Sequence, residues 1–145
     1  MKVNYHTHTR RCNHAIGSEE DYIKAAIEAK FDEIGIACHT PWDFGDGYKS
    51  RVRMQPEELD DYIFQLLTLR EKYADQISIK IGLECEYCPH HMTYLNKILR
   101  YKPIDYIILG NHYHIDEQKG YYFGRPQFGE QQIKDYVADT IMGIK

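Results

Sequence analysis

The feature that most constrains the fold is a regular alternation of strand-like and helix-like segments along the chain. Short apolar runs alternate with longer segments in which apolar residues recur at helical spacing. The strand-like runs cover residues 2–8, 32–40, 77–87 and 104–114, and the helix-like segments cover residues 22–30, 56–74, 92–101 and 128–145. Strands that alternate with helices over short connections form parallel sheets with right-handed crossovers. The sequence therefore predicts an α/β fold of about four βα units.

The length places these units in one domain. The chain has 145 residues, enough for one hydrophobic core, and no repeat, low-complexity tract or linker divides residues 1–145. Four βα units are half of the number in a closed eight-unit barrel, which takes about 250 residues. Two architectures are therefore open at this point, a small open α/β sheet and part of a barrel.

The composition argues against several classes of protein. The chain has 18 Lys+Arg against 22 Asp+Glu and is 43% hydrophobic, which excludes an intrinsically disordered chain. No net positive charge is available to neutralise phosphates, so we expect no nucleic-acid partner. No apolar run approaches the about 18 residues of a membrane span, and the first residues lack the apolar core of a secretory signal. We expect a cytoplasmic protein whose cysteines are reduced, namely Cys12, Cys38, Cys85 and Cys88.

Histidines and carboxylates lie at the carboxyl ends of all four predicted strands. In a parallel α/β fold these ends face one common crevice, where ligands bind. We therefore predict that side chains far apart in the chain converge there, namely His6, His8, His39, Glu84 and His112. Imidazole and carboxylate together suit borderline divalent metals such as zinc, manganese or iron. Four strand ends of this composition favour a metal site over separate structural histidines.

The spacing of these residues favours one shared site. Side chains two apart in an extended strand point to the same face, so His6 and His8 can bind one ion together. His14 lies in a following loop that can fold back toward the same crevice. One carboxylate such as Glu84 can bridge two ions, and two-metal sites with ions about 3.5–4 Å apart carry out phosphoryl transfer.

Other candidate ligands have a structural interpretation that competes with the functional one. Cys85 and Cys88 have zinc-ribbon spacing, but the chain holds no second pair, so we expect no structural zinc. His90 and His91 open a predicted helix and are expected to be solvated. His114 follows closely on the fourth strand and is a weaker candidate ligand.

Arginines and tyrosines in loops near the strand ends are candidates for substrate contact. An arginine can hold a phosphate through paired N–H donors, and the arginines in these loops are Arg10, Arg11, Arg51, Arg53 and Arg125. Of these, we take Arg53 and Arg125 as candidate substrate-binding residues. Most tyrosines fit amphipathic packing, while Tyr48, Tyr113 and Tyr122 are candidate pocket walls.

Several segments together resemble the PHP (polymerase and histidinol phosphatase) superfamily. The opening of that family is similar to His6-Thr7-His8-Thr9 with His14, followed by a strand that ends Ile34-Gly35-Ile36-Ala37-Cys38-His39-Thr40-Pro41. The segments that resemble the histidinol-phosphate phosphatase branch are Arg53-Met54-Gln55-Pro56-Glu57-Glu58-Leu59, Gly82-Leu83-Glu84-Cys85-Glu86-Tyr87 and Asp105-Tyr106-Ile107-Ile108-Leu109-Gly110-Asn111-His112. The match runs along nearly the whole chain, and the motifs are specific in combination.

The resemblance implies a distorted (β/α) barrel, of which this chain provides about four βα units, with up to three divalent ions. The ligands that it implies for the three ions are, in order, His6, His8 and Glu84; Glu84 and His112; and His14 and His39. The resemblance implies a metal-dependent phosphomonoester hydrolase with Glu84 and His112 as catalytic residues. The implied substrate is a phosphorylated small molecule of histidine biosynthesis.

The chain also departs from the family pattern. Family members continue into further βα units with another histidine ligand and an Asp-x-His motif, whereas this sequence contains no Asp-x-His and stops at Lys145. We therefore expect a domain truncated before the C-terminal metal motif, with fewer ions and lower activity than a complete member. Its open first and fourth strands are expected to recruit a partner, either a second copy or a complementing C-terminal fragment.

Two alternative functions stay open. One is a truncated or degenerate PHP domain that binds metal or a partner without turnover. The other is a PHP phosphoesterase with a different phosphorylated substrate, such as a nucleotide or a phosphoprotein. The sequence does not separate them from the leading hypothesis, because the resemblance places part of the substrate choice in a C-terminal portion that this sequence lacks.

Overall fold

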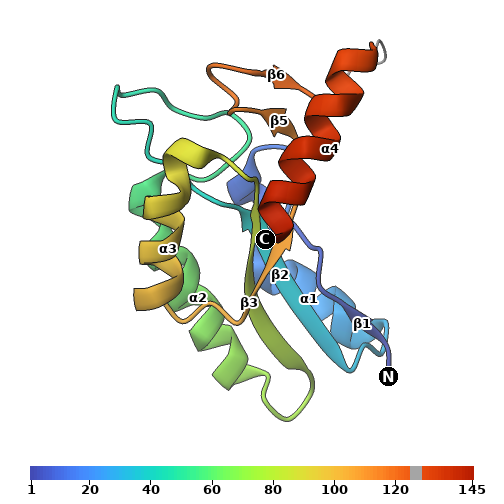
Figure 1. Ribbon diagram of the computed structural model, residues 1–145. Helices are drawn as coiled ribbons and strands as arrows, with labels where there is room; N and C mark the ends of the chain where they lie inside the picture. The colour runs from blue at the N-terminus through green and yellow to red at the C-terminus, as the bar shows by residue number, and fades with distance from the viewer. Residues whose placement is uncertain (125–128) are drawn as a thin grey trace.

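A curled sheet of four parallel strands forms the centre of the computed structural model, which describes residues 1–124 and 129–145 (Figure 1). The strands lie side by side in chain order: β1 (Val3–Asn4), β2 (Glu33–His39), β3 (Ser78–Cys85) and β4 (Tyr106–Leu109). All three pairings are parallel. The sheet curls into half of a barrel, which resolves the two architectures that the sequence left open.

The pairing of β2 with β3 fixes the position of the predicted site. Seven consecutive residues pair in register, from Glu33 with Ser78 to His39 with Glu84. Aligned residues of neighbouring parallel strands point to the same face of the sheet. His39 and Glu84 therefore lie beside each other at the carboxyl end of one face.

Helices cover the other face of the sheet. The helices are α1 (Glu19–Glu28), α2 (Leu59–Lys72), α3 (Met92–Tyr101) and α4 (Glu130–Ile144), and short 3-10 turns precede the first three: η1 (Arg10–Cys12), η2 (Pro56–Glu58) and η3 (Pro89–His91). Ser18 and Asp21 form a capping box at the start of α1. Pro56 opens η2, which leads directly into α2.

The hydrophobic core lies between this covered face and helices α1, α2 and α3. Alternate residues of β2 and β3, such as Ile36 and Ile81, are fully buried there. Tyr62 of α2 is also fully buried, and its hydroxyl lies 2.8 Å from the carbonyl oxygens of Ile36 and Gly82. This hydroxyl ties α2 to two neighbouring strands within the core.

One aromatic ring covers the earlier residues of β2 and β3 on the face of the sheet that carries His39 and Glu84. Tyr106 of β4 lies across Gly35 and Gly82, and a Cβ added at Gly82 would lie 2.3 Å from the Tyr106 Cζ atom. The Tyr106 hydroxyl also donates a hydrogen bond to the carbonyl oxygen of Tyr5 at 2.5 Å. The two glycines thus make room for a ring that closes the floor beneath the site.

The first and fourth strands are shorter than the sequence predicts. The strands expected over residues 2–8 and 104–114 pair only over Val3–Asn4 and Tyr106–Leu109. After β4 the backbone at Gly110 passes directly over the Glu84 side chain. A Cβ added at Gly110 would lie 2.0 Å from Glu84 Oε1, so this position has room only for a glycine. Beyond Gly110, β5 (Tyr113–His114) and β6 (Tyr121–Tyr122) form an antiparallel pair that the sequence analysis missed.

An apolar surface remains open beside β4. Among the described residues, β1 and β4 each pair with one neighbouring strand, and α4 contacts β4 and β5 without burying any of its side chains. Its exposed apolar residues are Ile133, Tyr136, Val137, Ile141, Met142 and Ile144. The expected association with a second copy or a C-terminal fragment stays a prediction. No helix of the described part is long and apolar enough to cross a bilayer.

We expect Gly82→Ala to lower the free energy of unfolding by about 1–3 kcal/mol, because the new methyl group overlaps the Tyr106 ring. The double variant Gly82→Ala/Tyr106→Ala tests the cause. The Gly82 substitution should cost clearly less in the Tyr106→Ala background, as measured by urea unfolding. An equal cost in both backgrounds would contradict the steric explanation.

Candidate metal centre

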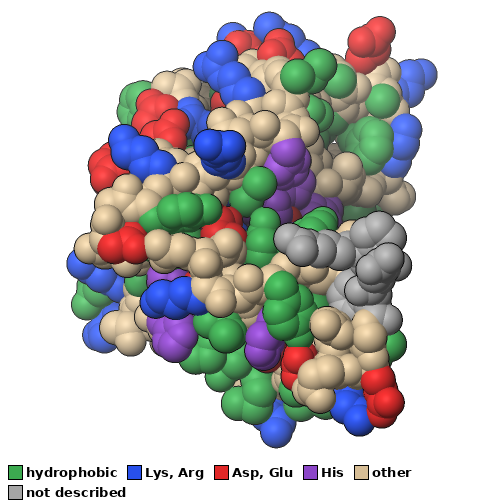
Figure 2. Space-filling model, turned by 90° about the horizontal axis from the view of Figure 1, so that it is seen from above, with side chains coloured by type: hydrophobic (Ala, Val, Ile, Leu, Met, Phe, Trp, Pro, Cys, Tyr) green, Lys and Arg blue, Asp and Glu red, His purple; other side chains and the backbone are tan. Residues whose placement is uncertain are grey.

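One crevice at the carboxyl end of the sheet collects the histidines and carboxylates of the predicted site. Figure 2 looks down on this end of the molecule and shows histidine side chains in a hollow of the surface. The crevice has a volume of about 440 Å³, and its charged and histidine lining consists of His6, His8, His14, His39, Glu84, Glu86 and His112. The structure therefore brings together all six residues that the sequence analysis nominated as metal ligands.

Glu84 lies at the centre of this cluster and is 2% exposed. Its Oε1 atom lies 3.2 Å from His6 Nε2 and 3.4 Å from His112 Nε2. Its Oε2 atom lies 3.0 Å from His8 Nε2 and 3.1 Å from His39 Nδ1. One buried carboxylate is thus surrounded by four imidazoles from three segments of the chain, the first of which supplies both His6 and His8.

His14 joins the cluster through a turn rather than through a strand. Asn13, just after η1, has a φ of 57°, a left-handed conformation that asparagine adopts more easily than most residues. The turn brings the His14 Nε2 atom to 3.1 Å from His39 Nε2. His14 therefore extends the cluster away from Glu84, on the far side of His39.

Burial and neighbouring charges set the protonation states around Glu84. Burial alone raises the pKa of Glu84, but the close contact with His8 and the charges of the other nearby histidines outweigh it and hold this pKa at about 2. Burial lowers the pKa of His39 to about 3, in spite of the adjacent carboxylates. At neutral pH the carboxylate is ionised and His39 is neutral. These are the states in which the two side chains bind metal.

The buried donor atoms fit a divalent cation. Glu84 Oε2 and His39 Nδ1 are buried and close together, yet within the described part of the chain neither makes a hydrogen bond of acceptable geometry. Two groups of three side chains can each offer ligand atoms to one ion, because within each group these atoms lie within 4.8 Å of one another. The groups are His6, His8 and Glu84, and His39, Glu86 and His112. Unsatisfied nitrogen and oxygen atoms that converge in this way match the donor set of zinc, manganese or iron.

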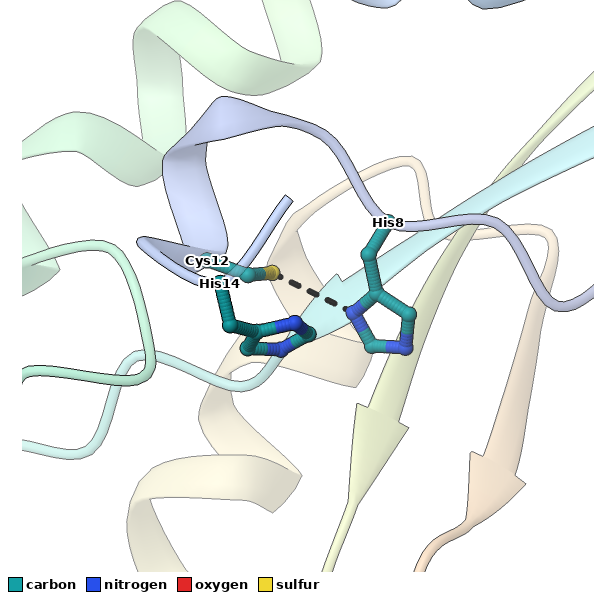
Figure 3. A group of neighbouring side chains, drawn as sticks. All are labelled: His8, Cys12 and His14. Atoms are coloured by element: carbon teal, nitrogen blue, oxygen red, sulfur yellow. Dashed lines mark hydrogen bonds between the residues drawn. The ribbon is translucent and has the colours of Figure 1, made fainter. Parts of the chain in front are cut away.

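Cys12 lies beside the cluster, and the sequence analysis did not place it there (Figure 3). Its Sγ atom is 3.3 Å from His8 Nδ1, and it groups with His8 and His14 within ligand distance. A hydrogen bond with Cys38, together with burial, raises the pKa of the Cys12 thiol, so the sulfur is not a ready thiolate ligand. All four cysteines are free and buried, as the sequence analysis expected of reduced thiols.

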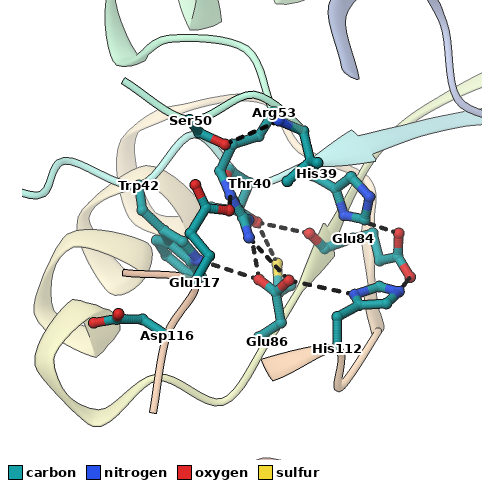
Figure 4. A network of polar contacts seen from close by, with 12 residues as sticks. His39, Thr40, Trp42, Ser50, Arg53, Glu84, Glu86, His112, Asp116 and Glu117 are labelled. Carbon is teal, nitrogen blue, oxygen red and sulfur yellow. Dashed lines mark hydrogen bonds and ion pairs between the residues drawn. The ribbon is translucent and has the colours of Figure 1, made fainter. Parts of the chain in front are cut away.

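Arg53 takes a different position from the one expected of a substrate-binding residue. It is 1% exposed, and its guanidinium group binds Glu86 through two N–H groups and Glu117 through a third (Figure 4). These donors are therefore engaged by carboxylates of the protein itself. The other candidate, Arg125, lies outside the described residues.

Two histidines outside the cluster have structural contacts. His91, expected to be solvated, is buried and stacks on Trp42 with ring centroids 5.2 Å apart, so that expectation was wrong. His114, the weaker candidate ligand, places its Nδ1 atom 2.8 Å from Asp139 Oδ2 on α4. Neither residue lines the crevice.

Two of the three tyrosines named as candidate pocket walls line the crevice. Tyr113 and Tyr122 face each other across the β5–β6 pair and form one wall. Tyr48 lies instead in the polar loop between β2 and η2, against Phe44. The hairpin that the sequence analysis missed thus supplies the aromatic side of the crevice.

Comparison with known proteins identifies the family. The model of the PHP domain matches residues 4–144. The chain belongs to the PHP domain family. It is 36% identical over 123 residues to a "Probable histidinol-phosphatase" of Schizosaccharomyces pombe, covering 80% of this chain and 40% of that protein. It is 30% identical over 111 residues to a protein of the same name from Deinococcus radiodurans, covering 74% of this chain and 41% of that protein.

The fold is shared with a solved histidinol phosphate phosphatase of this kind. The Lactococcus lactis enzyme, complexed with zinc, L-histidinol and phosphate, superposes with a TM-score of 0.74 at 20% identity. The match covers 99% of this PHP chain and 53% of the Lactococcus chain. This chain thus spans about two fifths of the length of the curated relatives and about half of this structure. The predicted PHP-type half-barrel is confirmed.

The low pKa of His39 gives the metal-free protein an expected pH dependence. An unfolded histidine titrates near pH 6.5, so below that pH the unfolded chain takes up a proton that native His39 does not bind. This linkage lowers stability as the pH falls from about 6.5 toward 3. His112, whose pKa its bond to Glu86 raises, acts in the opposite direction.

We expect His39→Gln to lose less stability than the wild type between pH 7 and about pH 5, as measured by urea unfolding in the presence of a chelator. For each protein, the free energy of unfolding at the lower pH is subtracted from that at pH 7. A destabilisation that is equal at both pH values therefore cancels. An identical pH dependence in both proteins would contradict the assignment of a neutral, buried His39.

Proposed function

We propose that this chain binds divalent metal ions in the crevice and hydrolyses a phosphomonoester there, with histidinol phosphate as the substrate. The observation that carries the proposal is the Glu84 carboxylate with four imidazole nitrogens within 3.4 Å, at the carboxyl ends of the strands of a PHP domain. The names of both curated relatives support a phosphatase-type function. The zinc, histidinol and phosphate of the Lactococcus lactis structure support the metal and the substrate class.

The residues of the crevice divide into three sets around the proposed ions. Those sets are His6, His8 and Glu84; Glu84 and His112; and His14 and His39. When bound, such ions supply Lewis-acid activation of water and neutralisation of phosphate charge. Glu84 contributes the negative charge that two sets share, because its carboxylate lies within 3.4 Å of the histidines of both.

The remaining lining shapes the space for the substrate. Tyr113 and Tyr122 offer aromatic surface on one side, and Val52 offers a small apolar contact. With Arg53 engaged by two carboxylates, the metal ions are the main cationic partners proposed for the phosphate. As parts of the same proposal, the pathway is histidine biosynthesis and the compartment is the cytoplasm, where free thiols stay reduced.

A second candidate function is metal binding without turnover. The chain spans only 40–41% of the curated relatives, and its sequence contains no Asp-x-His. Fewer ligands per ion would weaken the third set, His14 and His39, first. Metal content measured together with activity separates this candidate from the leading one.

Metal analysis and phosphatase assays on the purified chain test the proposal directly. We expect bound zinc, manganese or iron, and hydrolysis of histidinol phosphate in preference to nucleotides and phosphopeptides. Removal of the metal by a chelator should lower the melting temperature, because a ligand at a hundred times its Kd stabilises the folded state by about 2.7 kcal/mol. Metal without hydrolysis would favour the second candidate, and no metal would overturn both.

Glu84→Gln should reduce both metal content and hydrolysis, the latter by at least about a hundredfold, because the variant keeps the shape of the side chain but loses the shared charge. His90→Gln is a matched control, since His90 is exposed and does not line the crevice. Near-normal hydrolysis by Glu84→Gln would contradict the central role of this carboxylate.

A further inference from the structure

Glu86 lies two residues beyond Glu84 but has entirely different surroundings. It is 2% exposed and follows directly on the last residue of β3. Its Oε2 atom accepts hydrogen bonds from Arg53 Nη1 at 3.0 Å and from Trp42 Nε1 at 3.1 Å. Its Oε1 atom lies 3.0 Å from Arg53 Nη2 and 3.3 Å from His112 Nδ1 (Figure 4).

These contacts leave Glu86 no capacity to bind a metal ion. A carboxylate offers about four lone-pair positions, and four N–H groups occupy them. Distance alone would group Glu86 with His39 and His112 as a set of ligands. Because its lone pairs are occupied, Glu86 does not belong to that set, and only the two histidines stay candidate ligands.

Arg53 and Trp42, which we call the clamp around Glu86, are its partners on the side away from His112, and Arg53 has further contacts of its own. Besides its two bonds to Glu86, Arg53 donates to Glu117 Oε2 at 2.9 Å and to the Thr40 carbonyl oxygen at 3.0 Å. Each of the three charged side chains is at most 3% exposed. A buried ion network of this kind is costly to desolvate and contributes little net stability, so its value lies in fixing positions.

The clamp determines which nitrogen of His112 carries the proton. An ionised carboxylate can only accept hydrogen bonds, so the His112 Nδ1 atom that faces Glu86 must donate. In the neutral ring the other nitrogen, Nε2, then keeps its lone pair. That atom lies 3.4 Å from Glu84 Oε1, on the crevice side of the ring.

We propose that Glu86 is a positioning residue, clamped by Arg53 and Trp42, that holds His112 in the Nδ1–H tautomer with Nε2 directed into the crevice. The tautomer follows from the difference between the two contacts of the ring, because Nδ1 makes a hydrogen bond with Glu86, whereas the contact of Nε2 with Glu84 at 3.4 Å lacks hydrogen-bond geometry. Its consequence for metal binding rests on the proposed function, because it requires that His112 binds an ion. Arg53 thereby acts on the site through Glu86 and His112 rather than on a phosphate.

Glu86→Gln offers a specific test because an amide has only one accepting end. All groups around Glu86 are donors, so the amide NH₂ of the variant must face one of them. Trp42 and Arg53 cannot become acceptors, whereas His112 can do so by moving its proton to Nε2. The variant should therefore switch His112 to the Nε2–H tautomer.

Nitrogen-15 NMR of the metal-free protein reads the tautomer directly, at an alkaline pH where the ring is neutral. We expect Nδ1–H in the wild type and in the control Glu71→Gln, which changes an exposed carboxylate of α2. We expect Nε2–H in Glu86→Gln. Nε2–H in the wild type would overturn the proposal even if the variant does not fold.

Zinc titration of the same proteins measures the consequence. We expect the Glu86→Gln variant to bind zinc about 10–100-fold more weakly than the wild type at the site that contains His112, and Glu71→Gln to bind it equally. An unchanged affinity with an unchanged tautomer would overturn the positioning role. A wild type that shows the expected tautomer but binds no zinc would overturn the proposed function and leave the assignment of the tautomer intact.

Discussion

The burial of the Glu84 carboxylate at the end of β3 is the constraint on which the site depends. An isolated buried charge is too costly to maintain, so the chain must bring polar partners to it from several directions. Three segments do so and together place four imidazoles within 3.4 Å of it. The close passage of Gly110 over this carboxylate shows how tightly the backbone is packed around it.

Two carboxylates that are neighbours in sequence perform different tasks because their partners differ. Glu84 is surrounded by histidines, whose nitrogens can accept or donate, and its own Oε2 atom and His39 Nδ1 are buried without a hydrogen bond at the crevice. Glu86 is surrounded by donors, one of them the permanently charged Arg53. The first arrangement is open to a cation, and the second is closed to it and holds the neighbouring His112 in place.

Much of this architecture could be predicted because it depends on local pattern. The strand–helix alternation predicted the parallel sheet, and the histidines at the strand ends predicted which side chains converge. The prediction failed where contacts between distant segments decide the outcome. The chain leaves the sheet early at Gly110, the β5–β6 pair supplies Tyr113 and Tyr122, and His91 is buried against Trp42.

The sequence by itself determined the fold class, the family and the ligand-bearing strand ends, because hydrophobic periodicity and the order of the motifs are properties of the chain. Only the tertiary structure decided the roles of Arg53 and Glu86. From the sequence, both residues could face a substrate or a metal ion, since the identity of a charged residue does not show which group it binds in the folded protein. Their pairing across the 40–53 loop and the end of β3 buries both charges and turns them toward each other. The packing of segments far apart in the chain decides this pairing, and no local sequence pattern predicts it.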